Sequence, residues 1–475
     1  MSLGRTRSLW WERQGLGDDA RAEDVARAIA VTGWLRTLGG ADVYIAARAR
    51  CPGMTRAELD AAVAHGELRV IPAVRGCIYL VPARFVADLM ALNAEPWRKQ
   101  TETDLAKANA TFAVVESTAR TVFDVLAAPM TTDAIRRALP ARSIPSFGEA
   151  GKTAGLSSPL PLALRLLELD GRIERTLDGG RLDTDRYLWR RAAWSTPAAA
   201  ADDDARLANV VTAFLDFAGP STLEQIAAWS GRSQRELAPI LELVRAEPVT
   251  IEGVGPAFAQ PGDIDCAHEA LLPLGLRFLG FEDNYLVNHG GLAVVSDPRH
   301  HAIEVDIWGR SKPESIGTAK HVLSRTIVID GLVAGFWEID PRANAAVWMT
   351  FDPPKPAVAD QIEAVARELA TFLLDDVRNC RVFSLDTIEG VQDRADRIKQ
   401  HGARRSRSAS KSNPGSKSNP GSGSNPGSKS NPGSKPKVSS KSKKVATKRT
   451  AVAAKSSKKP GAKQPKKRSS RSGGR

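Results

Sequence analysis

The sequence predicts an α+β fold for residues 1–400 and a disordered segment for residues 401–475. Up to about residue 262, short helical patterns alternate with pairs of strand-like runs. Between residues 263 and 400, strand-like runs predominate and a long helical pattern follows them. The last 75 residues contain no aromatic side chain, no Leu and no Ile, so they cannot bury enough apolar surface to offset the entropy of an ordered backbone.

The first 105 residues contain three predicted helices followed by a predicted hairpin. The first helical pattern ends at Gly39-Gly40, and Thr55 with Glu58 forms a capping-box signature at the start of the third helix. The expected elements are helices at 23–38, at 43–50 and from Thr55 to about Leu68, and strands at 69–75 and 77–81 joined near Gly76. This is the element order of a winged helix-turn-helix domain.

The same order recurs twice, so the sequence predicts tandem winged helix-turn-helix domains at 1–105, 106–198 and 199–262. The second copy has helices at 131–139 and 159–169 and a hairpin that turns at Asp178-Gly-Gly, where positive φ is needed. The third copy has a helix at 207–217, a helix opened by a capping box at Ser221-Thr-Leu-Glu, and a candidate recognition helix at 234–244. Strands near Val249 and Ala257 then flank a Gly-Pro wing.

Residues 263–400 are expected to form a small β-rich domain closed by one helix. Strand-like runs occur at 303–307, 326–329, 333–339 and 347–351, and a helical pattern occurs at 359–374. Asp330-Gly331 is a hairpin signal between two of the runs. The body is predicted to end near Gln400.

The charge of the chain is divided unevenly between the body and residues 401–475. The whole chain has 67 Lys and Arg and 54 Asp and Glu, and residues 401–475 hold 22 of the basic residues and none of the acidic ones. The body therefore has 45 basic and 54 acidic residues, a formal charge of −9, and the tail has +22. A solvated polycation binds polyanions by releasing their counterions, with little sequence preference. The alternatives are a DNA or RNA anchor and a solubilising or surface-adhesive tail.

The tail has two parts. Residues 411–434 repeat Lys-Ser-Asn-Pro-Gly-Ser four times, with Gly423 in place of Lys in the third copy. The rest resembles, in composition only, the C-terminal tail of a linker histone. The basic residues expected to contact DNA there are Lys443, Lys444, Lys458, Lys459, Lys466, Lys467 and Arg468.

The remaining composition predicts a cytoplasmic, nucleoid-associated protein with no cofactor, no metal and no membrane partner. No apolar run approaches the roughly 20 residues of a membrane span, and the N-terminus lacks the apolar core of a signal peptide. The four Cys residues are far apart and are expected to be reduced and buried. His300 and His301 are adjacent and are either metal ligands or, as we expect, loop residues.

Several segments taken together give the chain a family resemblance from about residue 9 to 393. They are Trp11-Glu-Arg-Gln-Gly-Leu, Val74-Arg-Gly-Cys-Ile-Tyr-Leu-Val-Pro, the middle winged helix and Thr326-Ile-Val-Ile-Asp-Gly-Leu-Val-Ala-Gly-Phe-Trp. These resemble the winged-helix DNA-binding family that includes the AlkZ-like DNA glycosylases. The resemblance implies a concave DNA-binding surface formed by three winged helices, and an activity that removes alkylated or cross-linked bases.

This sequence departs from the catalytic motif of that family. The motif is Gln-x-Gln or Gln-x-Asp about six residues before a Tyr, and alignment on Tyr44 places it at Arg36 and Leu38. Arg36 is a fixed cation and Leu38 is apolar, so neither can activate a water. Asp42 is either a substitute carboxylate or a surface-loop residue.

Other polar groups have two interpretations each. Glu282 and Asp283 are either an acid pair or, as we expect, a turn, because adjacent side chains on an extended segment face opposite ways. Arg75 at the first hairpin, and Arg165 and Arg235 on candidate recognition helices, are either phosphate contacts or solvated charges. Two functions therefore stay open, a non-catalytic DNA-binding protein and a divergent DNA glycosylase.

Overall fold

The structure is a computed structural model that describes residues 1–17, 24–140, 143–184, 186–193, 202–269, 272, 275–307 and 312–411. The tail residues expected to bind DNA, from Lys443 to Arg468, lie outside the described residues. The α-helices are α1 (Leu3–Arg13), α2 (Val25–Thr32), α3 (Asp42–Arg50), α4 (Arg56–His65), α5 (Val86–Lys107), α6 (Phe112–Val125), α7 (Thr132–Ala138), α8 (Gly148–Thr153), α9 (Leu160–Leu169), α10 (Asp203–Ala218), α11 (Leu223–Ser230), α12 (Gln234–Leu243), α13 (Asp263–Glu269), α14 (Asn284–Val287), α15 (Pro356–Thr371) and α16 (Ile388–Lys411). The strands are β1 (Leu35–Arg36), β2 (Leu68–Pro72), β3 (Ile78–Pro82), β4 (Met130–Thr131), β5 (Ile173–Leu177), β6 (Tyr187–Arg191), β7 (Glu247–Ile251), β8 (Gly255–Ala259), β9 (Leu276–Leu279), β10 (Glu304–Val305), β11 (Glu314–Ser315), β12 (Arg325–Ile329), β13 (Leu332–Asp340) and β14 (Ala345–Thr350).

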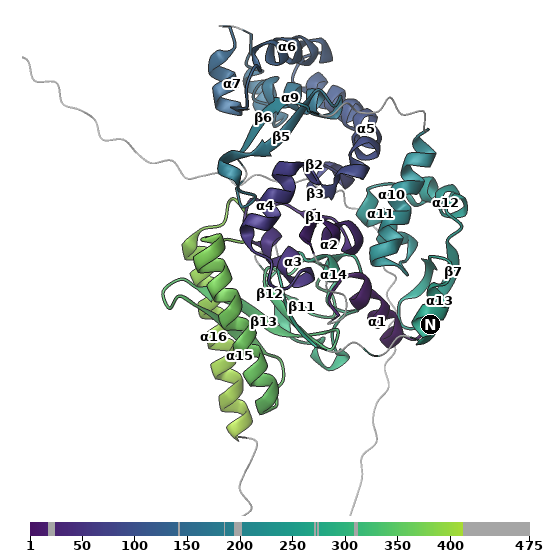
Figure 1. Cartoon of the computed structure of the whole chain (residues 1–475), viewed down its shortest axis with the longest axis vertical. Coiled ribbons are helices and arrows are strands. Elements are labelled where there is room, and N and C mark those ends of the chain that lie inside the picture. Colours follow the sequence, from purple (N-terminus) through teal and green to yellow (C-terminus); the bar gives the residue numbers. More distant parts are fainter. Residues whose placement is uncertain are drawn as a thin grey trace, which may run out of the picture. The chain divides into compact units, whose positions relative to one another are not determined.

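The fold therefore mixes helices with small antiparallel sheets, as the α+β prediction requires (Figure 1). The first sheet has the order β1-β3-β2, the second has the order β4-β6-β5, and β7 pairs with β8. The largest sheet has four strands in the order β14-β13-β12-β9. Each of the first two hairpins turns through a short 3₁₀ segment, Val74–Gly76 and Asp178–Gly180.

The first predicted helix is shorter than expected. α2 ends at Thr32 instead of continuing to Leu38, because Gly33 adopts φ 111, a conformation that other residues rarely take. A Cβ at Gly33 would also lie 3.0 Å from side-chain atoms of Phe217 and Asn284. The chain then turns into β1, where Arg36 pairs with Tyr79 of β3.

The predicted capping boxes are formed in one place as expected and in another with a shift of one residue. Thr55 and Glu58 form the reciprocal pair at the start of α4. At α11 the pair is Thr222 and Gln225, so the prediction of Ser221 as the capping residue is wrong. Ser221 instead exchanges two backbone hydrogen bonds with Phe258 at the edge of β8, at 2.9 and 2.8 Å. Its backbone thereby continues the small β7–β8 sheet.

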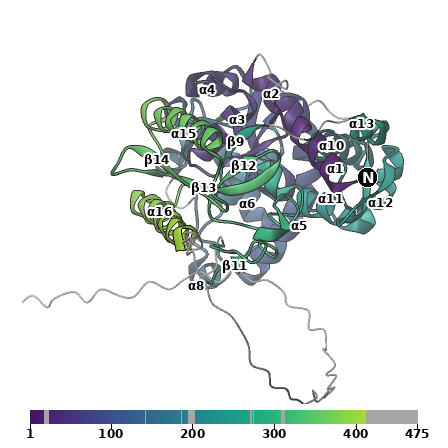
Figure 2. The same ribbon diagram turned by 90° about the horizontal axis from the view of Figure 1, so that it is seen from below.

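The four-stranded sheet β14-β13-β12-β9, called the C-terminal sheet below, packs against a different hydrophobic core on each face. Neighbouring residues of a strand point to opposite faces, so each contributes to a different core. Trp337 packs on one face with Ile362 and Leu369 of α15. Phe336, its neighbour in β13, packs on the other face with Ile398 of α16. Figure 2 shows both helices beside this sheet. Asp330 and Gly331 both have positive φ, 50° and 74°, so the predicted hairpin turn is confirmed.

Two long helices were not predicted from the sequence. α5 has 22 residues and packs against α9 and α10. α16 has 24 residues and continues to Lys411, so its last part lies beyond the expected end of the body near Gln400. The predicted tail boundary at residue 401 is therefore inside a helix. The helical spacing was present, because Val391, Ala395 and Ile398 recur every three or four residues and are buried.

The cysteines and the N-terminal helix complete the fold. Cys51 and Cys380 are buried, whereas Cys266 is exposed, contrary to the expectation that all four would be buried. Trp10 and Trp11 of α1 pack in a core that also contains residues of β7, β8 and the C-terminal sheet.

Along the described ranges, no helix has the length and apolar character needed to cross a bilayer.

A buried ion-pair network joins the start of α3 to the C-terminal sheet. Arg325 of β12 is fully buried and donates to both oxygens of Asp42, at 3.1 and 2.8 Å, and to Glu338 at 2.5 Å. Arg394 of α16 binds the other oxygen of Glu338 at 2.7 Å and both oxygens of Asp386. Burial works to lower the pKa of Arg325, but the two carboxylates outweigh it and raise the pKa. Arg325 is therefore charged and fully compensated.

We expect Asp42→Asn to lower the free energy of unfolding by about 3 kcal/mol, because it leaves a buried guanidinium with one charge partner fewer. The measurement is a urea titration of both proteins, followed by circular dichroism. Asp133→Asn is the matched control, since the Asp133 side chain is 75% exposed and its pair with Arg136 is at the surface. That control is expected to stay within about 0.5 kcal/mol of the parent. Equal midpoints for Asp42→Asn and the parent would refute the role of the network.

Candidate nucleic-acid interface

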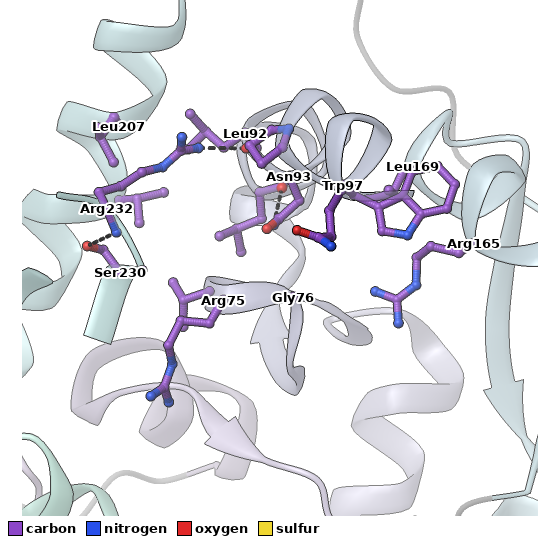
Figure 3. Close-up of a pocket in the computed structure, with 16 residues that line it drawn as sticks. Arg75, Gly76, Leu92, Asn93, Trp97, Arg165, Leu169, Leu207, Ser230 and Arg232 are labelled. Carbon is purple, nitrogen blue, oxygen red and sulfur yellow. Dashed lines mark hydrogen bonds between the residues drawn. The ribbon is translucent and has the colours of Figure 1, made fainter. Parts of the chain in front are cut away.

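A cavity of about 320 Å³ lies where the first hairpin, α5, α9, α10 and the turn after α11 meet (Figure 3). We call it the central cavity. Its walls are mostly apolar, and its polar side chains come from different parts of the chain. The lining residues used below are Arg75, Trp97, Arg165, Leu207, Ser230 and Arg232.

Arg165 of α9 shares its carboxylate partner with another arginine. Its Nε lies 3.5 Å from Glu168, which is already held by Arg175 through two hydrogen bonds of 2.6 and 3.1 Å. Burial lowers the pKa of Arg165, because its guanidinium has lost water without gaining a partner of its own. In Figure 3 this guanidinium extends from α9 towards the hairpin that carries Gly76. An anion entering the cavity would supply the missing charge.

Arg75 is held at the tip of the first hairpin in a conformation that is uncommon for a non-glycine residue. Its φ is 57°, and its Nη2 lies 3.4 Å from the hydroxyl of Tyr79. Burial works to lower the pKa of Arg75, but Tyr79 and more distant acidic groups raise it overall. Its side chain crosses Gly231, where a Cβ would lie 2.8 Å from the Arg75 Cγ. Gly231 therefore permits the β2–β3 hairpin to contact the turn between α11 and α12.

The third predicted arginine does not line the cavity. Arg235 is exposed on the first turn of α12 and is not among the lining residues. Arg232, two residues before the start of α12, lines the cavity instead and donates to the carbonyl of Leu92 at 2.6 Å. Sequence reasoning missed Arg232 because nothing local distinguishes it from Arg235. The structure thus brings together Arg75 and Arg165 and adds Arg232.

The position of the family's catalytic motif is close to a second polar group. Arg36 donates from Nη1 to Oε2 of Glu282 at 2.9 Å, and Nδ1 of His321 lies 2.9 Å from Oε1 of the same carboxylate. We call these three residues the Arg36–Glu282–His321 cluster. The Glu282 side chain is only 6% exposed, whereas that of His321 is 56% exposed. The sequence did not connect the three, which are separated by 246 and 39 residues.

Glu282 and Asp283 do not act as an acid pair, because their side chains have different partners. Glu282 has φ 57°, an uncommon conformation that is retained where the surroundings hold it. Asp283 is buried, binds Arg50 through two hydrogen bonds of 2.9 Å, and accepts from the backbone N–H of Tyr285 at the start of α14. The two carboxylates thus diverge from one turn.

Asp42 and Leu38 are close to this cluster without sharing its chemistry. Asp42 is buried, contrary to a surface-loop position, and both of its oxygens are bound by Arg325. Its Oδ1 also accepts from the backbone N–H of Phe281 at 2.6 Å, one residue before Glu282. Asp42 thus fixes the turn that carries Glu282, and its carboxylate is occupied by structural contacts.

A small hollow lies between Arg36, Leu38 and Glu282, with a volume of about 20 Å³. That volume is enough for one water molecule. The Nε of Arg36 is buried and has no hydrogen-bond partner among the residues that the structure describes. The hollow therefore offers a donor at Arg36 and an acceptor at Glu282.

The adjacent histidines His300 and His301 belong to no metal-binding group of side chains among the described residues. Within the described ranges, no group of three or more His, Cys, Asp or Glu side chains could hold a metal ion. His300 lies in a short 3₁₀ turn after Asp297, and its Nε2 is 3.0 Å from Asp352. It is a loop residue with one acidic partner.

Comparisons with known proteins agree with the arrangement of these elements. The structure of Streptomyces sahachiroi DNA glycosylase AlkZ is similar, with a TM-score of 0.60 and 19% sequence identity over 80% of this chain and 98% of that chain. A search of the curated proteins finds no match. A family model described as "DNA glycosylase AlkZ-like" matches residues 13–373 of the 475. Because that match covers more than half of the chain and spans the Arg36–Glu282–His321 cluster and the whole C-terminal sheet, the chain belongs to the AlkZ-like DNA glycosylase family.

Proposed function

We propose that this protein binds DNA through three winged helices and through the basic segment that follows α16. The observation that carries the proposal is the central cavity, which Arg75, Arg165 and Arg232 line from three separate units. Arg165 in particular lacks a full charge partner of its own, so a phosphate oxygen would complete its coordination. The body has a formal charge of −9, and a local cluster of cations is therefore needed for any contact with a polyanion.

The element order supports a winged-helix assignment for each unit. The first runs α2, β1, α3, α4 and the β2–β3 hairpin, and the second runs α6, β4, α7, α9 and the β5–β6 hairpin. The third runs α10, α11, α12 and the β7–β8 hairpin, with the Ser221–Phe258 bridge in the place of the short strand. On this proposal α9 and α12 correspond to recognition helices, and Arg75 and Arg165 are phosphate contacts.

The basic segment supplies a second, sequence-independent contribution. Residues 412–475 contain 18 Lys and Arg and no acidic residue, including the predicted DNA contacts from Lys443 to Arg468. Such a segment gains free energy from counterion release on any duplex. With DNA as the partner, the proposed place of action is the nucleoid, in the cytoplasm.

We expect the basic segment to provide most of the non-specific affinity. The test is a salt titration on random duplex DNA with the full chain and with residues 1–411, which keep the whole of α16. If the segment neutralises even half a dozen phosphates, the slope of log K against log salt should be steeper by about five in the full chain. Equal affinities and equal slopes would show that the segment does not act on DNA.

The central cavity is tested in residues 1–411, where the basic segment does not mask its contribution. We expect Arg165→Gln to weaken binding to all duplexes alike and to reduce the salt slope by about one, because it removes one phosphate contact. Arg299→Gln is the matched control, since Arg299 is 74% exposed and paired with Asp297 on the C-terminal domain. Fluorescence anisotropy at several salt concentrations measures both. An unchanged slope in Arg165→Gln would mean that the cavity does not face DNA.

A second function, the excision of bases from DNA, is favoured by the family to which the chain belongs. The residues at the motif position argue against the family's usual chemistry. An amide or carboxylate at positions 36 and 38 could accept a hydrogen bond from an attacking water, whereas Arg36 has only donors and Leu38 has neither donor nor acceptor.

We therefore expect no release of 7-methylguanine from duplex DNA by the unmodified protein. We expect the double variant Arg36→Gln, Leu38→Gln to gain this activity, because it restores an amide pair beside an otherwise intact fold. Alkaline cleavage at abasic sites measures release, and the single variant Leu38→Gln is the control for a change in packing alone. Release by the unmodified protein would contradict the placement of the motif at Arg36 and Leu38.

A further inference from the structure

The Arg36–Glu282–His321 cluster contains a carboxylate–imidazole pair that the proposed function does not use. Nδ1 of His321 faces Oε1 of Glu282 at 2.9 Å, which fixes the ring and leaves Nε2 on the opposite side. Nε2 has no partner in the part of the chain that the structure describes, and the side chain is 56% exposed. A histidine oriented in this way is a typical proton donor or acceptor in catalysis.

Glu282 is held more firmly than a surface ion pair requires. Its side chain is 6% exposed, its backbone has φ 57°, and the residues on either side are anchored. Phe281 donates its N–H to Asp42, and Asp283 is clamped by Arg50. A buried carboxylate without partners is costly, and Glu282 has two, Arg36 and His321. The turn therefore presents one carboxylate in a fixed orientation to one imidazole.

The charges of the cluster are compatible with the positive charge that develops on the sugar during base excision. Glu282 neutralises Arg36 at 2.9 Å, so the guanidinium at the motif position is not an isolated cation. The hydrogen bond to Glu282 raises the pKa of His321, with burial and the positive charges of Arg36 and Arg75 acting in the opposite direction. The imidazolium form thus persists to higher pH than in an ordinary histidine.

We propose that Glu282 and His321 form the catalytic pair of a DNA glycosylase whose substrates are uncharged nucleobases, with Nε2 of His321 as the general acid and Glu282 as the residue that positions it. This inference rests on the proposed DNA binding. An N-alkylated purine cation leaves the sugar as a neutral molecule and needs no proton. An uncharged base leaves as an anion unless it is protonated, so only this class requires an imidazolium at the site. An imidazolium would also repel a cationic base.

The proposed reaction balances as a hydrolysis. The bond between C1′ and the base nitrogen breaks with its electron pair moving to the base, while the Nε2–H of His321 passes its proton to the base. The oxygen of a water bonds to C1′, and one proton of that water passes to the solvent, which later reprotonates Nε2. The hollow of about 20 Å³ between Arg36 and Glu282 can hold such a water. As His321 gives up its proton, its positive charge disappears from the site where the sugar becomes cationic.

The experiment uses the full chain and duplexes that contain hypoxanthine, 1,N6-ethenoadenine or uracil, with 7-methylguanine as the charged comparison. We expect release of at least one uncharged base, at a rate that rises as the pH falls and levels off below the pKa of His321. His321→Gln keeps the size and polarity of the side chain but cannot titrate, so it should lower the rate about a hundredfold or more and flatten the pH profile. Glu282→Gln should move the midpoint of the profile to lower pH, because the charge that raises the His321 pKa is gone.

His300→Gln is the matched control, since His300 also contacts a carboxylate, Asp352, but belongs to a different loop. It should leave the rate and the pH profile unchanged. A proton NMR titration of the histidines, assigned with His321→Gln, should place the His321 midpoint above 6.5 in the parent and lower in Glu282→Gln. The midpoint measured by NMR does not depend on which base the duplex substrates contain.

The outcomes separate this inference from DNA binding. If the protein binds all four duplexes but releases none of the three uncharged bases at any pH, the catalytic pair is refuted and the DNA-binding function stands. The same conclusion follows if His321→Gln releases bases as fast as the parent. If none of the duplexes is bound at low salt, the proposed function fails and the inference fails with it.

Discussion

The buried guanidinium of Arg325 is the interaction on which the rest of the body depends. It joins Asp42 at the start of α3 to Glu338 of β13, and through Glu338 it reaches Arg394 of α16. A charge at this depth is tolerated only because every partner is in place. The network therefore couples the first helical unit to the C-terminal sheet, and neither can shift without exposing an unpaired charge. This explains why a carboxylate beside the family's motif position has a structural role.

The same network positions the candidate catalytic cluster. Asp42 accepts a hydrogen bond from Phe281, and a Cβ at Gly280 would lie only 2.8 Å from the Asp42 Oδ1. The absence of a side chain at Gly280 lets the 280–283 turn approach α3 closely enough for Glu282 to meet Arg36. Strain at Glu282 is thus compensated by ion pairs at Asp42 and Asp283, a pattern common at functional sites. The buried ion pairs of Asp42 and Asp283 therefore set the geometry of the cluster.

The sequence was a good guide wherever a feature depends on neighbouring residues. The Thr55–Glu58 capping box and the Asp330–Gly331 turn are formed as predicted, because each is decided within four residues. The early end of α2 was missed, since the contacts that require Gly33 come from Phe217 and Asn284. α5 and α16, of 22 and 24 residues, were missed. Their apolar faces are completed by contacts with distant parts of the chain.

The candidate site depends even more on contacts between residues that are distant in the sequence. Arg36 read alone is a cation that disfavours the cationic sugar of base excision, and that interpretation treats its charge as isolated. Its partner Glu282 is 246 residues away, and the histidine that shares this partner is 39 residues further on. No local pattern links them, because the pairing depends on the closure of the C-terminal sheet against α3. With Glu282 in place, the Arg36–Glu282 pair contributes no net charge, and the charge of the cluster is set by the protonation of His321. The charge environment of position 36 is therefore decided by long-range packing, and it cannot be deduced from the residue at that position alone.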